Sequence, residues 1–97
     1  MKEHQLKTLA PYWDALAGEG KTFEVRRDDR GFQKGDILVL RRVELVEKPG
    51  SSEKVLRESV CHYTNSHREL RRKITYVLTG GQFGIEPGYV VLGLKKA

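Results

Sequence analysis

Residues 22–40 of this 97-residue chain read TFEVRRDDRGFQKGDILVL, and they decide the fold class. The first five of these residues alternate in polarity, which predicts a strand with Phe23 and Val25 on its buried face. After a polar stretch that contains a glycine, residues 37–40 are apolar on both faces, which predicts a strand covered on both sides. Two strands joined by a polar loop indicate a strand-rich fold.

The segment before this stretch predicts one short helix. Pro11 suits the first helical turn, where its missing N–H costs nothing. Trp13 and Leu16 lie at helical spacing and are expected on one buried face. Gly18 then ends the helix.

Three further segments alternate and predict strands at residues 5–9, 70–79 and 89–94. The residues expected to face the core in the last two of these strands are Ile74, Tyr76, Leu78, Val90, Leu92 and Leu94. About five strands and one or two short helices in so short a chain indicate an α+β fold. We expect a small, mostly antiparallel β-barrel or sandwich.

The length limits the chain to a single domain, residues 1–97. Within it, the stretch EKPGSSE at residues 47–53 carries turn and loop signals. We therefore expect a variable loop at about residues 47–68, in which residues 55–60 also suit a short turn of helix.

Composition excludes several classes of protein. One cysteine excludes a disulfide framework, and with three scattered histidines it offers no closed set of metal ligands. We expect no metal and no cofactor. The longest apolar run is residues 37–40, and the polar N-terminus lacks a signal-peptide core. A soluble, cytoplasmic protein without membrane contact is expected.

The charge of the chain indicates anionic partners. Its 18 Lys and Arg residues against 13 Asp and Glu residues give a net charge of +5. Two basic clusters are candidates for binding the phosphates of a nucleic acid, namely Arg27, Arg30, Lys34, Arg71, Arg72 and Lys73. Alternatively, these cations belong to a solvated surface and form ion pairs with neighbouring carboxylates. This interpretation is best supported at residues 26–30, where two aspartates lie among the arginines.

The segment GEGKT at residues 18–22 lacks two requirements of a nucleotide-binding phosphate loop. Such a loop has a glycine five residues before its Gly-Lys pair, where this chain has Ala15. It also follows a strand and opens a helix, whereas here the helix comes first. We interpret the segment as a helix stop followed by a turn into a strand.

The motif GKTFEVR at residues 20–26, followed by Gly-Asp at residues 35–36, resembles the signature of ASCH domains in the PUA-like superfamily. It looks closest to a small bacterial and phage subgroup of uncharacterised function. The likeness extends to the leader and to the last two strands, so that it covers roughly residues 4–46 and 69–94.

This resemblance implies a compact PUA-like β-barrel that binds RNA or a nucleotide in a cleft beside the barrel. In ASCH domains the lysine, glutamate and arginine of the motif lie at that cleft. Carried over to this chain, the ligand-binding candidates are Lys21, Thr22, Glu24, Arg26, His4 and Lys7. Strand alternation supports one part of this assignment, because it places Glu24 and Arg26 on the same face of the strand.

One ASCH branch consists of amidohydrolases that deacylate a modified cytidine, with a lysine and, three residues later, a threonine. Lys21 is present here, but Glu24 stands in place of the threonine, so the hydroxyl nucleophile is missing. If the protein is an enzyme, Lys21 and Glu24 are its catalytic candidates as an acid–base pair. An ion pair that orients Arg26 or a ligand is the more economical interpretation.

Three functional hypotheses follow. The first is an RNA- or nucleotide-binding module with a Lys/Glu/Arg cleft and a basic face. The second is a small phage-type modulator whose basic face binds an acidic host protein. The third is an amidohydrolase-like enzyme that acts on a modified nucleoside.

Overall fold

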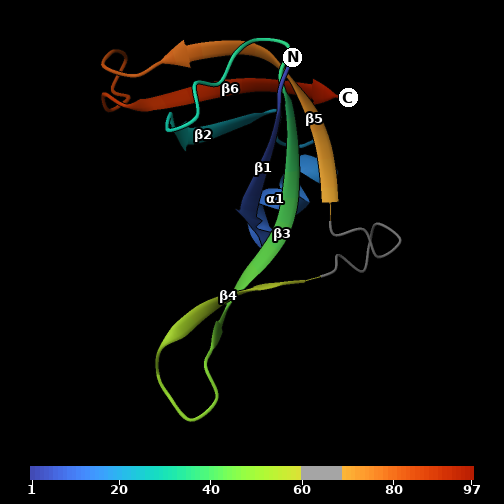
Figure 1. Cartoon of the computed structure of the whole chain (residues 1–97), viewed down its shortest axis with the longest axis vertical. Coiled ribbons are helices and arrows are strands. Elements are labelled where there is room, and N and C mark those ends of the chain that lie inside the picture. The colour runs from blue at the N-terminus through green and yellow to red at the C-terminus, as the bar shows by residue number, and fades with distance from the viewer. Residues whose placement is uncertain (60–68) are drawn as a thin grey trace. The chain divides into compact units, whose positions relative to one another are not determined.

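The computed structural model describes residues 1–59 and 69–97. In those residues it contains one helix and six strands (Figure 1). In chain order these elements are β1 (Glu3–Leu9), α1 (Ala10–Ala17), β2 (Phe23–Arg27), β3 (Ile37–Glu47), β4 (Lys54–Glu58), β5 (Glu69–Thr79) and β6 (Tyr89–Lys96). The predicted class, a small α+β protein made mostly of strands, is confirmed.

The strands form one mixed sheet in the order β1-β3-β5-β6-β2, and β4 pairs with β3 outside this path. The pairs β2–β6, β3–β4 and β5–β6 are antiparallel, while β1 and β3 run in the same direction (Figure 1). A barrel closes only when its two edge strands pair. In the described residues β1 and β2 end the order, so the sheet is open, and the expectation of a closed barrel is wrong.

The chain divides into two compact units. The first unit consists of Met1–His4, Thr22–Leu38 and Arg71–Ala97, and it holds β2, β6 and most of β5. The second unit consists of Gln5–Lys21 and Val39–Leu70, and it holds α1, β4 and most of β1 and β3.

In the second unit, α1 packs as its sequence predicts. Its Trp13 is fully buried and donates a hydrogen bond from Nε1 to the carbonyl oxygen of Leu40 at 2.9 Å. The helix ends where Gly18 donates its backbone N–H to the carbonyl oxygen of Asp14 at 2.9 Å. Arg42 of β3 binds the Asp14 carboxylate with two hydrogen bonds, at 2.8 and 3.0 Å, and so ties the helix to the strand.

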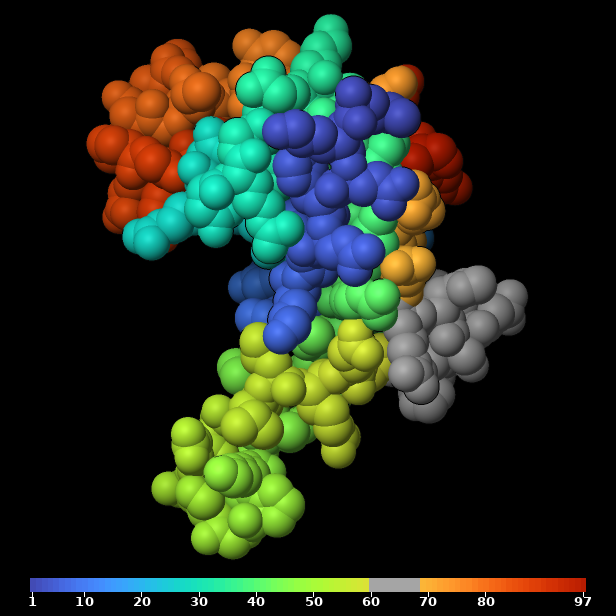
Figure 2. Space-filling model, in the orientation of Figure 1, coloured from blue at the N-terminus to red at the C-terminus, as the bar shows by residue number. Residues whose placement is uncertain are grey.

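The predicted loop at about residues 47–68 is partly wrong, because it contains β4. This strand pairs with β3 in an antiparallel hairpin whose register runs from Val43↔Glu58 to Glu47↔Lys54. All five residues of β4 are exposed, and Figure 2 shows the tip of the hairpin in green to yellow. A strand this exposed lacks the strict alternation that a half-buried strand carries, which explains why a short helix suited it equally well. The rest of the predicted loop, residues 60–68, lies outside the described residues.

In the first unit, β2, β6 and β5 have one buried and one exposed face. Val90, Leu92 and Leu94 of β6 are buried, as predicted, together with Ile74 of β5. In β2 the prediction is wrong, because Phe23 and Val25 are 46% and 53% exposed, whereas Glu24 is only 4% exposed. Alternation separates the two faces of a strand but does not say which face is buried. In β2 the pairing with β6 determines which face is buried, since Glu24 lies opposite the buried Leu92.

The prediction that Ile74 and Tyr76 share a face is also wrong. The register of β5 against β6 shifts between these residues, which makes Thr75 the extra residue of a β-bulge. Ile74 is fully buried while Tyr76 is 64% exposed. The bulge brings the Thr75 hydroxyl so close to Gly93 that a Cβ atom there would lie 3.0 Å from its oxygen. A larger residue at this position would require the Thr75 side chain to shift.

Candidate functional site

Large side chains and cations gather on the exposed face of the first unit. The cross-strand pairs place Phe23 and Tyr76 on either side of Gly93, and Arg27 next to Tyr89. By alternation the residues that share this face, called the outer face below, are Phe23, Val25, Arg27, Lys73, Tyr76, Leu78, Tyr89, Val91, Gly93 and Lys95. It therefore presents aromatic rings in its middle and positive charges at both ends.

One end of the outer face carries a pocket of about 540 Å³ with three lysines in its lining, called the lysine pocket below. Lys34 comes from the loop before β3, and the directly paired Lys73 and Lys95 come from β5 and β6. Thr75 also lines this pocket. Within residues 1–59 and 69–97, none of the three lysines forms an ion pair with a carboxylate.

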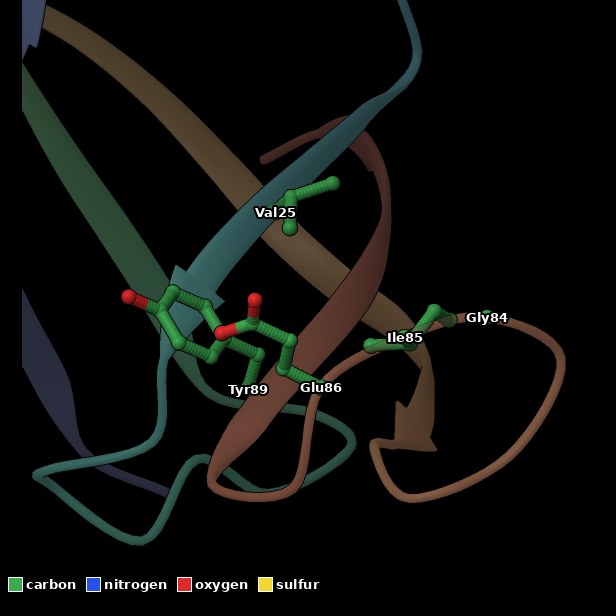
Figure 3. A pocket seen from close by; sticks show the side chains of 5 residues that line it. All are labelled: Val25, Gly84, Ile85, Glu86 and Tyr89. Atoms are coloured by element: carbon green, nitrogen blue, oxygen red, sulfur yellow. The ribbon is translucent and has the colours of Figure 1, made fainter.

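The other end of the outer face carries a second pocket, of about 380 Å³. Figure 3 shows that Val25 of β2 and Tyr89 at the start of β6 line it, together with Gly84, Ile85 and Glu86 of the preceding loop. The guanidinium carbon of Arg27 lies 5.8 Å from the centre of the Tyr89 ring, within the range of a cation–π contact. The Arg27 side chain is thus held beside the Tyr89 ring at this end of the outer face.

The opposite face of β2 carries the predicted Glu24–Arg26 pair. Arg26 Nε donates to Glu24 Oε2 at 3.1 Å, and the two side chains are 22% and 6% exposed, respectively. Both residues lie opposite buried residues of β6, Val90 and Leu92. The structure therefore brings these two candidates together as a largely buried ion pair.

Three further ligand-binding candidates are Lys21, Thr22 and Lys7. Lys21 belongs to the second unit, where its ammonium lies 5.2 Å from the centre of the Tyr12 ring. Thr22 is exposed and accepts the backbone N–H of Leu94 at its carbonyl oxygen at 2.8 Å. Lys7 is exposed on β1.

His4, predicted as a ligand-binding residue, is buried against Asp36. Its Nε2 atom lies 2.9 Å from Asp36 Oδ2, and the edge of its ring packs on Phe32 with the centroids 4.8 Å apart. The Asp36 carboxylate also accepts the backbone N–H groups of Lys2 and Gln33, each at 3.1 Å. These contacts fasten the first residues of the chain to the loop before β3.

Burial alone would raise the pKa of Asp36, but the hydrogen bonds from His4 and from the Lys2 and Gln33 N–H groups outweigh it. The pKa of Asp36 is therefore held below its ordinary value of 3.8. A carboxyl whose folded-state pKa is lowered stabilises the fold above the unfolded-state pKa and loses that contribution as the pH falls through the folded-state pKa.

We expect Asp36→Asn to destabilise the protein most at neutral pH. The variant cannot titrate at this position, so the difference in unfolding free energy from the wild type should shrink as the pH falls below about 4. Urea unfolding monitored between about pH 7 and pH 3 measures this difference. The exposed Asp29, replaced in the same way, serves as the control. A difference that stays constant across the range would contradict the role of the Asp36 carboxylate.

The predicted phosphate-binding cluster at residues 71–73 does not share one face. Arg71 is exposed and donates to Glu3 Oε2 at 2.9 Å, while Arg72 is only 8% exposed and donates to the carbonyl oxygen of Arg71 at 2.8 Å. Of these three residues, only Lys73 lines the lysine pocket. In the loop after β2, Arg30 lies 3.8 Å from the Asp29 carboxylate.

Sequence reasoning missed Lys95 and Tyr76 as site residues. The alternation of β6 places Lys95 on the same face as Gly93. That Lys95 lies beside Lys73 depends on the register of β5 against β6, which the sequence does not show. Tyr76 was hidden by the bulge at Thr75. No local signal in the sequence marks that bulge.

These features define a class of protein: a small, strand-rich α+β fold whose first unit exposes a basic and aromatic sheet face. In the part of the chain that the structure describes, no group of His, Cys, Asp and Glu side chains suits a metal ion, and no helix is long and apolar enough to cross a membrane. The chain belongs to the family described as a domain of unknown function, DUF3850, whose model matches residues 3–94. No curated protein matches the chain.

Proposed function

We propose that this protein is a nucleic-acid-binding module that holds single-stranded RNA on its outer face. One observation carries the proposal: three lysines without carboxylate partners, within the described residues, line one pocket, and two of them share a sheet face with exposed aromatic rings. Single-stranded nucleic acid is bound by this combination, because cations attract the phosphates and the bases stack on the rings. The resemblance of the 20–26 motif to ASCH domains implies the same class of ligand.

The geometry supports single strands over duplexes. Phe23 and Tyr76 lie two strands apart on the outer face, which is about 10 Å at the usual spacing of strands. An exposed ring can stack only on a base that is not already stacked within a helix. Unpaired nucleotides meet this condition, and the bases of a duplex do not.

The test is the binding of a fluorescently labelled oligouridylate of about twelve nucleotides, measured by anisotropy at several salt concentrations. We expect a dissociation constant of about 1–100 μM near physiological salt, tighter binding at lower salt, and weaker binding of the corresponding duplex. Equal binding of both forms would contradict the stacking role. No detectable binding of RNA by the pure protein, together with a stable complex with an acidic protein, would favour the modulator hypothesis instead.

Replacing one exposed ring separates stacking from charge. We expect Tyr76→Ala to weaken the binding of the single strand by about tenfold, because stacking of one base contributes about 1–3 kcal/mol. The dependence of affinity on salt should stay unchanged, since no cation is removed. Tyr12→Ala, at an exposed tyrosine of the second unit, is the matched control and should leave affinity unaltered. Equal losses in both variants would place the bases elsewhere.

A further inference from the structure

We propose that the lysine pocket binds the terminal phosphate of a nucleic-acid strand, a phosphomonoester, in preference to an internal phosphodiester. This proposal rests on the function proposed above, because it assigns one group of the same ligand to one end of the outer face. The pocket is lined by three lysines from three separate segments of the chain, and Thr75 also lines it.

Among the described residues, the lysines of the pocket lack the carboxylate partners that several arginines of the same unit have. Arg26, Arg30 and Arg71 of the first unit each lie within 4 Å of a carboxylate, at 3.1, 3.8 and 2.9 Å. Lys34, Lys73 and Lys95 converge on one pocket and have no such partner among residues 1–59 and 69–97. Like charges that share a pocket repel one another, and a bound anion removes that cost.

The chemistry of the two kinds of phosphate then decides between them. A phosphomonoester carries a charge of about −1.5 to −2 at neutral pH and three acceptor oxygens. An internal phosphodiester carries one negative charge. Three lysines, each a compact charge with three rotatable donors, match the oxygens and the charge of the monoester better than those of a single diester. The Thr75 hydroxyl adds a neutral donor to the same lining.

The position of the pocket also fits the end of a strand of RNA. Lys73 and Lys95 form the last outward pair before β6 ends at Lys96. Tyr76 follows the bulged Thr75 on the same side, so that a base next to the bound phosphate would meet an exposed ring. A volume of about 540 Å³ lies within the usual range for pockets that bind small molecules and is ample for a phosphate with its sugar.

The test compares oligouridylates of identical length that carry a 5′-phosphate, a 3′-phosphate or only hydroxyl groups. We expect one of the phosphorylated forms to bind about tenfold more tightly than the hydroxyl form. The triple variant Lys34→Ala, Lys73→Ala, Lys95→Ala should lower this ratio to about one. A control triple variant at the exposed cations of the β3–β4 hairpin, Lys48→Ala, Lys54→Ala, Arg57→Ala, removes the same charge and should keep the ratio.

The outcomes separate this proposal from the proposed function. Binding of all three oligonucleotides with equal affinity would overturn the terminal-phosphate site and leave RNA binding intact. Absence of binding by any of them would overturn RNA binding itself. Free uridine monophosphate serves as a competitor, and a mononucleotide that binds as tightly as the phosphorylated strand would show that the pocket serves a free nucleotide, which contradicts the assignment to the end of a strand.

Discussion

Replacing Lys34, Lys73 and Lys95 together with alanine should lower the affinity for single-stranded RNA by about 100-fold at 0.1 M salt. Each neutralised phosphate charge on a single strand contributes about 0.7 to the slope of log K against log salt, so removing these three cations should flatten that slope by up to about 2. The corresponding loss of binding free energy is about 2.7 kcal/mol. The measurement is the same anisotropy titration, repeated from about 50 to 200 mM salt.

The hairpin triple variant of Lys48, Lys54 and Arg57 decides whether the effect is local. It changes the net charge of the protein by the same amount but removes cations from the second unit. We expect a much smaller loss of affinity, because only the general attraction of a basic protein for RNA is reduced. If the two triple variants lose affinity equally, net charge and not the lysine pocket governs binding.

Glu24→Ala should lower the free energy of unfolding by about 3 kcal/mol, because it removes the carboxylate to which Arg26 Nε donates on the buried side of β2. Affinity for RNA per folded molecule should be unchanged, since Glu24 lies on the face opposite the outer face. Urea unfolding measures the first quantity and anisotropy the second.

Two comparisons sharpen the Glu24 experiment. Glu24→Gln keeps an acceptor for Arg26 Nε and should lose less stability than Glu24→Ala. Asp29→Ala breaks the exposed Asp29–Arg30 pair and should cost less than about 1 kcal/mol. Unchanged stability in Glu24→Ala, with at least tenfold weaker binding of RNA, would show that Glu24 and Arg26 act on the ligand, as the resemblance to ASCH domains implies.

The helix and most strands are determined by patterns among neighbouring residues, so the sequence predicts them well. Trp13 and Leu16 mark α1, and the apolar run at residues 37–40 marks a strand buried on both sides. The exposed hairpin strand β4 has no buried face to impose a pattern, so its sequence does not distinguish it from a loop or a helical turn. Closure of the sheet depends on which strands pair, and local patterns do not carry this information.

The candidate site was harder to predict than the elements that bear it. Lys34 and Lys73 were both candidates, but their meeting with Lys95 depends on the register of β5 against β6. Phe23 alternates like a core residue and is exposed because its strand presents Glu24 to the buried side. Arg72 looks like a phosphate-binding residue and is buried, since neighbouring residues of a strand point to opposite faces.

Mapping the RNA on the protein by changes in backbone amide NMR signals tests the central claim most directly. With an oligouridylate of about twelve nucleotides, we expect the largest changes in β2, in β5 from Lys73 to Leu78, and in β6 from Tyr89 to Lys95. The amides of α1 and of the β3–β4 hairpin should change little. Changes confined to the hairpin, or none at saturating RNA, would contradict the assignment of the outer face as the RNA-binding surface.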